Sequence, residues 1–195
     1  ERRRMLGVLH FDHRLRGAES RADARFCRRI CAELGVRLVA GAWGGRHRDA
    51  SEAEARAARM RFFEQQARVV WLGHQQDDIA ESMLMRLARG SGSGGLAAPR
   101  PVQELAHGRV HLRPLLTLKR TEIVAALRNA GAEWREDSSN ATDSFFRNRV
   151  RRAVVPRWVA AAQRDALAGA ALARARLEEE DAALEAWVTE LHPLR

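Results

Sequence analysis

Four side chains that can do chemistry lie within one short segment: His74, Asp77, Asp78 and Glu81. The apolar run that ends at Gly73 is typical of a strand, and the pattern that follows is typical of a helix. On a helix, residues 74, 78 and 81 share one face, because they are four and three positions apart. Open α/β sheets bind ligands at the carboxyl ends of their strands, and carboxylates there can hold Mg²⁺ beside nucleotide phosphates. The segment therefore predicts a nucleotide site whose carboxylates can hold magnesium.

The same residues also have a structural interpretation. Acidic side chains in the first turn of a helix stabilise it by capping and by their interaction with the helix dipole. Glu81 can also contact Met85 or pair with Arg86 on a solvated face of the helix. The spacing alone leaves both interpretations open.

Arginine pairs occur in two further segments. Arg56 and Arg59 lie on one face of a predicted helix, and the guanidinium fork matches phosphate oxygens; a solvated basic face is the alternative. A denser array begins at Arg147 and continues with Arg149, Arg151 and Arg152. It suits RNA phosphates or a substrate's developing negative charge. In the competing account, these arginines form structural salt bridges with the polar segment 134–140.

Two other segments have weaker signals. His10 and His13 follow the first predicted strand, where they can bind phosphate or an adenosine, or form a hydrogen-bonded loop. Metal binding by these two histidines has no third ligand at a standard spacing. The glycine-rich turn that contains Gly90 can expose backbone N–H groups to an anion.

Strands alternate with helices in the first half of the chain, which predicts a parallel sheet with right-handed crossovers. Ser20 and Ser51 are the expected helix N-caps, Glu54 completes a capping box with Ser51, and Gly35 ends the first helix. The expected strands are 5–9, 36–40 and 68–73, and the expected helices are 20–34, 51–66 and 76–88. Next come a loop at 89–101, extended segments at 102–105 and 109–113, a helix at 119–129 closed by Gly131, a basic helix at 145–154 stopped near Pro156, and a long helix at 163–191.

Composition narrows the class of protein. The chain has 195 residues, is 46% hydrophobic and has a net charge of +9, with 34 basic against 25 acidic residues. A basic surface favours a nucleic-acid partner, although an arginine-rich chain in which Lys119 is the only lysine can also arise from coding bias. Cys27 and Cys31 fit core packing better than a disulfide framework. No apolar run is long enough to span a membrane and no signal peptide is present, so a cytoplasmic protein is expected.

Seven segments, in this order, resemble the tRNA(Ile)-lysidine synthases. Each is modest alone, but the ordered set is specific. The segments are His10-Phe-Asp-His-Arg-Leu-Arg, Ala55-Arg-x-x-Arg, His74-x-x-Asp-Asp-x-x-Glu, Arg89-Gly-Ser-Gly-x-x-Gly-Leu, Arg113-Pro-Leu-Leu, Trp134-x-Glu-Asp-Ser-Ser-Asn and Arg147-Asn-x-x-Arg.

The resemblance implies an N-type ATP pyrophosphatase with a doubly wound α/β core. Members of the family use ATP to adenylate the C2 carbonyl oxygen of the wobble cytidine in a tRNA(Ile) with a CAU anticodon, and the amine of free L-lysine then displaces AMP. Residues 1–156 are then the catalytic domain, and 157–195 a helical extension or linker. The implied catalytic residues are Asp78, Glu81 and Arg147, with Mg²⁺ at the two carboxylates. The implied ATP-binding residues are His10, Arg56, Arg59, His74 and Gly90, and the implied RNA-binding residues are Arg149, Arg151 and Arg152.

The sequence departs from the family pattern at its start. The family's phosphate loop, Ser-Gly-Gly-x-Asp-Ser, is absent from it, so we expect a piece of a larger protein or a chain that has lost its ATP cradle. Met60 and Gln76 are minor departures. Two other functions stay open: a non-catalytic tRNA-binding remnant, and a tRNA thiolase of the same superfamily. Thiolases often rely on cysteine pairs, for which Cys27 and Cys31 are ill placed.

Overall fold

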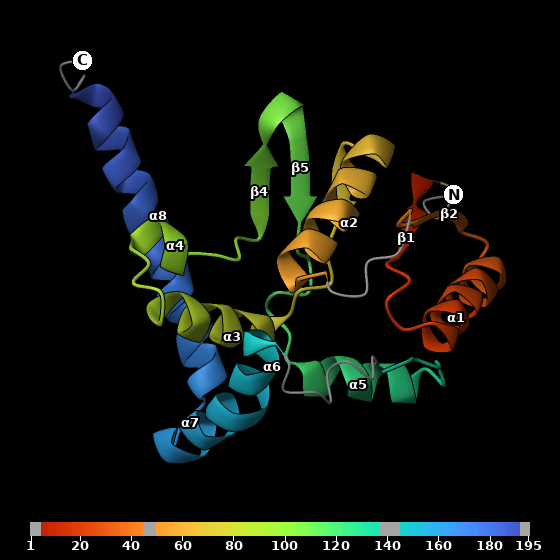
Figure 1. Ribbon diagram of the computed structural model, residues 1–195. Helices are drawn as coiled ribbons and strands as arrows, with labels where there is room; N and C mark the ends of the chain where they lie inside the picture. Colours follow the sequence, from red (N-terminus) through yellow and green to blue (C-terminus); the bar gives the residue numbers. More distant parts are fainter. Residues whose placement is uncertain (1–4, 45–49, 137–144, 192–195) are drawn as a thin grey trace. The chain divides into compact units, whose positions relative to one another are not determined.

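The computed structural model describes residues 5–44, 50–136 and 145–191, and Figure 1 shows the order of their helices and strands. The chain divides into two compact units. Unit 1 comprises Glu1–Val70 and His107–Arg109, and unit 2 comprises Trp71–Ala106 and Val110–Arg195. The predicted domain boundary near residue 156 is not a division between these units, and it stays a prediction.

Two parallel strands form the sheet of unit 1. Strands β1 (Gly7–Asp12) and β2 (Arg37–Ala42) pair in register from Gly7 opposite Arg37 to Asp12 opposite Ala42. Helix α1 (Ala18–Leu34) connects them, as a parallel pair requires. The predicted parallel pairing is therefore confirmed for the first two strands, although β1 begins later than the apolar pattern indicated. The third predicted strand, at 68–73, belongs to a separate sheet.

Helix α1 has one predicted end right and the other wrong. Gly17, with φ 52°, precedes the helix as its N-cap, and Ser20 is a buried residue of the first turn. Ser20 is therefore not the cap, because the glycine makes the turn into the helix further upstream. At the other end Gly35 adopts the left-handed conformation, and the N–H groups of Gly35 and Val36 donate to the oxygens of Ala32 and Cys31, which closes the helix.

Helix α2 (Glu52–Gln66) begins as predicted. The N–H of Glu54 donates to Ser51 Oγ at 3.2 Å, and the N–H of Ser51 donates to Glu54 Oε2 at 2.8 Å. Phe63 is buried, and the ring of Phe62 lies so close to Gly41 that a Cβ atom there would be 2.5 Å from it. Gly41 therefore lets the helix approach β2.

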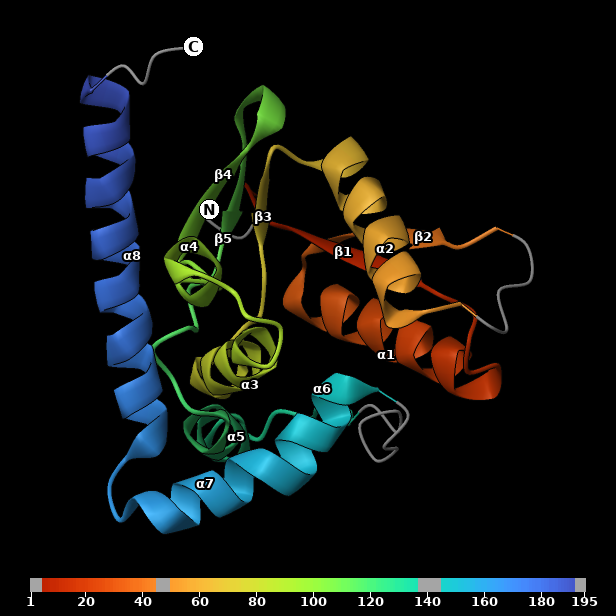
Figure 2. The same cartoon turned by 60° about the vertical axis from the view of Figure 1, so that its left-hand side comes forward.

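Helix α3 (Gln76–Leu87) lies at the centre of unit 2, where Ile79 and Ala80 form a core cluster with Leu116 and Ala170. Figure 2 shows α8 (Ala166–Glu190) running past α3 and the short helix α4 (Ser93–Leu96). Asp165 begins α8: its carboxylate accepts the N–H of Ala168 at 3.1 Å and the ammonium of Lys119 at 2.5 Å. The predicted long helix is confirmed, whereas the predicted loop at 89–101 contains α4.

A second sheet has the strand order β3-β5-β4, with β3 at Val69–Trp71, β4 at Val102–Leu105 and β5 at Arg109–Leu112. The last two form a hairpin through Ala106–Gly108, where His107 and Gly108 have φ 62° and 66°. Consecutive positive φ angles match the twist of a hairpin. The N–H of Leu72 donates to the oxygen of Leu112 at 2.8 Å. The boundary between the units passes through β3 and β5. Both predicted extended segments, at 102–105 and 109–113, are confirmed as strands.

The basic segment continues further than predicted. Helix α5 spans Arg120–Asn129. After residues 137–144, which the structure does not describe, come α6 (Phe146–Arg149), a π-helical segment (Val150–Val154) and α7 (Val155–Ala162). Pro156 does not stop the helix, because it lies in the first turn of α7, where a missing N–H costs nothing. Within residues 5–44, 50–136 and 145–191, no helix has the length and apolar character needed to cross a membrane.

Candidate functional site

Asp77 and Asp78 lie in the first turn of α3, and each accepts a hydrogen bond from a backbone N–H group. The N–H of Gln75 donates to Asp78 Oδ2 at 2.8 Å. The N–H of Arg120, the first residue of α5, donates to Asp77 Oδ2 at 2.9 Å. Asp78 therefore caps its own helix and Asp77 fixes the start of another, which is the structural role that the sequence left open.

Glu81 is buried and paired with arginines of the basic segment. It is only 2% exposed, and Asp78 is 8% exposed. Arg147 Nε donates to Glu81 Oε2 at 2.8 Å, and its Nη2 donates to Asp78 Oδ1 at 2.5 Å. Arg151 Nε donates to Glu81 Oε1 at 2.6 Å, and its Nη2 donates to Glu81 Oε2 at 3.0 Å. The interpretation in which Glu81 meets Met85 or Arg86 on a solvated face is therefore wrong.

The local helix geometry brings both arginines to the same carboxylates. Arg147 lies on α6 and Arg151 on the π-helical segment, with the buried residues Asn148 and Val150 between them. Predicted salt bridges between the arginine array and segment 134–140 are not seen within the described residues of that segment. Its residues 137–140 lie outside the description, and Glu136 pairs with Arg120 at 3.4 Å.

The charges in this cluster balance, because two carboxylates meet two guanidinium groups. Burial raises the pKa of the Asp78 carboxyl, against the opposing effects of Arg147 and the Gln75 N–H. The hydrogen bond to Glu81 raises the pKa of Arg151. The arginines remain charged, and the buried carboxylates are compensated by them.

The predicted magnesium role does not fit this arrangement. Both oxygens of Glu81 and one oxygen of Asp78 accept guanidinium N–H groups, and the second Asp78 oxygen accepts the Gln75 N–H. An ion would have to displace the arginines before it reached an oxygen. The described residues also contain no group of three or more His, Cys, Asp or Glu side chains placed to hold a metal. We therefore derive no step through Mg²⁺ at Asp78 and Glu81.

His74 lies between β3 and α3 and is bound by a buried arginine that sequence reasoning did not assign to the site. Arg113, 5% exposed, directs Nε at Nδ1 of His74 over 3.3 Å. Its other nitrogens donate to the oxygen of Arg100 at 2.7 Å and to Gln103 Oε1 at 2.8 Å. The signal in the sequence was a charged residue placed directly after a predicted strand and before apolar residues, in the segment Arg113-Pro-Leu-Leu.

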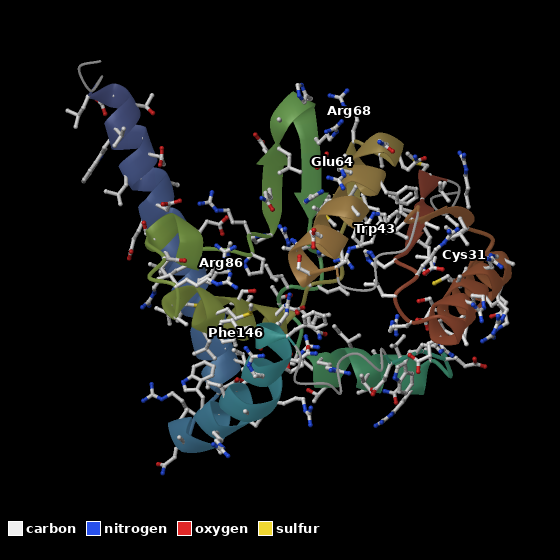
Figure 3. All side chains as sticks on the ribbon, viewed as in Figure 1. Cys31, Trp43, Glu64, Arg68, Arg86 and Phe146 are labelled. Carbon is white, nitrogen blue, oxygen red and sulfur yellow. The ribbon has the colours of Figure 1, made fainter. Side chains whose placement is uncertain are left out.

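The glycine-rich turn is engaged with the protein itself. Gly90, with φ 70°, lies in the turn after α3, whose C-cap is Ala88, and its N–H donates to the oxygen of Leu87 at 3.0 Å. Nη1 of Arg86, which Figure 3 labels, donates a hydrogen bond to the oxygen of Gly95. A Cβ atom on Gly94 would lie 2.8 Å from a carboxylate oxygen of Asp181 on α8. The N–H of Gly90 is thus already used, and Gly94 serves the close approach of α8.

The three predicted RNA-binding arginines differ in exposure. Arg151 holds Glu81, whereas Arg149 and Arg152 are exposed. The guanidinium of Arg149 lies 5.7 Å from the ring of Phe146, which Figure 3 labels on α6. Of the three, Arg149 and Arg152 are therefore the ones with exposed side chains.

In unit 1, His10 and His13 lie among aromatic rings at the carboxyl end of β1. The ring of Phe11 is 5.0 Å from His13 and 5.3 Å from Phe62, and Trp43, labelled in Figure 3, is 6.1 Å from His13. Buried Nε2 of His10 and buried Nδ1 of His13 have no hydrogen-bond partner among the described residues. Such atoms cost free energy until they find one.

A positive charge lies beside this ring cluster. Burial, followed by the charge of Arg59, lowers the pKa of His13. Arg59 is half-buried, and Arg56 on the same helix is exposed. His10 Nδ1 lies 3.6 Å from Cys27 Sγ, but burial raises the pKa of that thiol, so it stays protonated. Cys31 is buried, as predicted for a packing residue. Rings, unsatisfied nitrogens and an arginine together suit a planar heteroaromatic group joined to an anion.

The predicted site residues are therefore distributed over both units. His10, Arg56 and Arg59 belong to unit 1, and the others belong to unit 2. Within unit 2 the structure brings together Asp78, Glu81, Arg147 and Arg151, and separately pairs His74 with Arg113.

Comparison with known proteins supports a particular family. Residues 1–158 match the family model described as a PP-loop domain. The chain is similar to the tRNA(Ile)-lysidine synthase of Solibacter usitatus, with 46% identity over 164 residues that cover 80% of this chain and 35% of that protein. It is also similar to the tRNA(Ile)-lysidine synthase of Bacillus subtilis, with 39% identity over 76% of this chain and 34% of that protein. The chain spans about a third of the length of these curated relatives.

A solved structure adds to the fold. The U34-tRNA thiolase NcsA from Methanococcus maripaludis superposes with a TM-score of 0.68 and 12% sequence identity, covering 88% of this chain and 60% of that one. At this identity the likeness concerns the fold alone, which is α/β with a parallel sheet and a helical C-terminal part.

Proposed function

Because the chain belongs to the PP-loop domain family, we propose that it forms the catalytic part of an ATP-dependent tRNA-modifying ligase of the lysidine synthase type. The observation that carries the proposal is the 46% identity to the Solibacter usitatus lysidine synthase, which extends over 80% of this chain. The substrates proposed are a tRNA(Ile) with a CAU anticodon, ATP and free L-lysine.

In the proposed first step, the C2 carbonyl oxygen of the wobble cytidine attacks the α-phosphorus of ATP. The bond to the pyrophosphate oxygen breaks, and pyrophosphate leaves. A carbonyl oxygen is a poor leaving group, and its adenylation makes it a good one. In the second step an amine of lysine attacks C2, the C2–O bond breaks, AMP leaves and the amine loses a proton.

Arg147 is the group we assign to the negative charge that develops on the phosphate. Its side chain is 23% exposed, and two carboxylates fix its fork in place. A preorganised donor costs no reorganisation when the charge appears. Asp78 and Glu81 are then positioning residues that act through Arg147, which is a different role from that of metal ligands.

The ring cluster of unit 1 supports a place for the adenosine part of ATP. Its aromatic rings offer stacking surfaces, and Arg59 offers a charge to the phosphates. His10 and His13 each have a buried ring nitrogen without a partner among the described residues, which a ligand could satisfy in this proposal. Arg56, exposed on the same helix, is a second phosphate contact in this proposal.

The charge of the chain supports the RNA partner. The sequence has a net charge of +9, and Arg149 and Arg152 are exposed on the basic segment. Neutralised phosphates release counterions, so binding to tRNA is expected to weaken steeply with salt. A tRNA thiolase is the weaker alternative, because Cys27 and Cys31 lie one turn apart on α1 and burial raises the pKa of both thiols.

The test uses the whole gene product with transcribed tRNA(Ile), ATP and lysine. We expect pyrophosphate release and a tRNA mass gain that needs lysine. Arg147→Gln is expected to lower the rate by about a hundredfold, and Arg37→Gln on the exposed start of β2 serves as the matched control. Binding of tRNA without pyrophosphate release, or a mass gain that needs a sulfur donor, would overturn the proposal.

A further inference from the structure

His74 is held by a donor on one particular ring nitrogen. Arg113 Nε lies 3.3 Å from His74 Nδ1, with the N–H of the arginine directed at it. A guanidinium group has five N–H donors and no acceptor. Nδ1 must therefore offer its lone pair, and the proton of the neutral ring is carried by Nε2.

Arg113 cannot easily turn away from this contact. Its Nη1 donates to the oxygen of Arg100 at 2.7 Å and its Nη2 to Gln103 Oε1 at 2.8 Å, so three acceptors fix the plane of the fork. The backbone N–H of Arg113 donates to the backbone oxygen of Pro101 at 2.8 Å. Because Arg113 is 5% exposed, water does not compete for these bonds.

The backbone on either side of His74 is also fixed. The N–H of Leu72 donates to Leu112 at 2.8 Å, and the N–H of Gln76 donates to Leu118 at 2.9 Å. The segment that contains His74 is therefore hydrogen-bonded to β5 on its N-terminal side and to the turn after β5 on its C-terminal side. Arg113 follows β5 directly, so the same part of the chain positions both Arg113 and the His74 ring.

We propose that Arg113 is a positioning residue that fixes His74 as the neutral Nε2–H tautomer, so that His74 acts as a hydrogen-bond donor and not as a base. The role within a reaction rests on the proposed function, but the tautomer does not. A donor at Nε2 suits an oxygen acceptor, such as a phosphate oxygen or a base carbonyl. Nε2 has no lone pair with which to take the proton that the lysine amine loses.

The tautomer can be observed without turnover. The protein is labelled with ¹⁵N-histidine, and long-range proton–nitrogen correlations are recorded near neutral pH, with His74 assigned by its loss in His74→Gln. We expect a protonated Nε2 and an unprotonated Nδ1 in the wild type. In Arg113→Met the same ring is expected to become a mixture of tautomers. A wild-type Nδ1 that carries the proton, or an Arg113→Met ring that keeps the pure Nε2–H form, overturns the proposal. Should Arg113→Met fail to fold, the wild-type spectrum decides alone.

A matched pair of variants separates donor from base. His74→Gln retains an amide N–H that can donate, whereas His74→Ala has none. We expect the rate of tRNA modification to fall about a hundredfold in His74→Ala, with at least a tenfold recovery in His74→Gln. Equal losses in both variants would overturn the donor role. If the wild type shows no ligation but shows the Nε2–H tautomer, then the proposed function fails and the assignment of Arg113 stands.

Discussion

Unit 1 and unit 2 both contain predicted site residues, but the buried polar atoms of those residues differ in whether they have hydrogen-bond partners. In unit 2 every carboxylate oxygen of Asp78 and Glu81 has a donor, and Arg113 has three acceptors. In unit 1 a buried nitrogen of His10 and one of His13 have no partner among the described residues. The two sets of predicted ligand-binding residues are thus in opposite states before any ligand arrives.

This difference separates stability from binding. A buried donor or acceptor without a partner costs about 1–3 kcal/mol, and the cluster of Asp78, Glu81, Arg147 and Arg151 avoids that cost with its own side chains. Substitutions there should therefore harm the fold first. The unsatisfied histidines of unit 1 already bear the cost, so substitutions there should harm binding first.

The strongest test removes Glu81. Glu81→Leu leaves Arg147 and Arg151 partly buried without their main acceptor, and removal of one member of a buried pair costs about 3 kcal/mol or more. We expect the free energy of unfolding, measured with urea, to fall by that amount. Glu33→Leu is the control, because Glu33 pairs with Arg29 on an exposed face, where such pairs are worth about 0.5 kcal/mol. Equal losses in the two variants would show that the buried cluster does not stabilise unit 2.

The opposite result is expected in unit 1. His13→Phe replaces an unsatisfied nitrogen with an apolar ring beside Phe11 and Trp43. The free energy of unfolding should stay the same or rise, and affinity for a non-hydrolysable ATP analogue should fall about tenfold, as for one lost hydrogen bond. Calorimetric titration and urea unfolding check the two parts. Unchanged affinity would remove His13 from the proposed nucleotide site.

A smaller effect is expected at Asp77. Asp77→Ala removes the acceptor for the N–H of Arg120 at the start of α5, which should cost about 1 kcal/mol, as for other lost caps. Asp77→Asn retains a side-chain oxygen and should lose less. Thermal unfolding of both variants measures the difference, and a larger loss in the asparagine variant would contradict the capping role.

The smallest effect concerns pH. Burial, and then the charge of Arg59, lower the pKa of His13 below the ordinary histidine value of about 6.5. Between the folded and the unfolded pKa, the unfolded chain therefore binds a proton that the folded chain does not. Stability from this residue is therefore present above the unfolded pKa and lost as the pH falls below it. The wild type should lose more stability than His13→Phe when urea unfolding is repeated from pH 7.5 to pH 5.5. Parallel losses would show that His13 is not the source.

Local patterns predicted the elements well because their causes are local. The capping box of Ser51 and Glu54 and the left-handed turn at Gly35 depend on residues a few positions apart. The two errors at helix ends have the same origin, since neither the burial of Ser20 nor the continuation of the helix through Pro156 is visible in short windows.

The site was predicted in its members but not in its pairings. Glu81 and Arg147 were both named from the sequence, yet Arg147 was expected to meet either a phosphate or segment 134–140. They are separated by 66 positions, and only the packing of α6 on α3 joins them. The sequence places Arg113 in a motif but assigns it no role, because a donor can be assigned only when its acceptor is known.

The π-helical segment Val150–Val154 has a consequence for aligning and editing this chain. A π-turn amounts to one residue inserted into an α-helix, and in an uninterrupted helix Arg151 and Trp158, seven positions apart, would lie on nearly the same side. Here the arginine binds the α3 carboxylates while the tryptophan packs on the core cluster of α3 and α8. The extra residue turns the later part of the helix by about 100°. The same continuous helical segment can therefore direct Arg151 at the α3 carboxylates and Trp158 at the core cluster. A deletion of one residue within this segment should therefore be more harmful than most substitutions in it. When the segment is aligned with a regular α-helix, a gap of one residue belongs in the sequence of that helix.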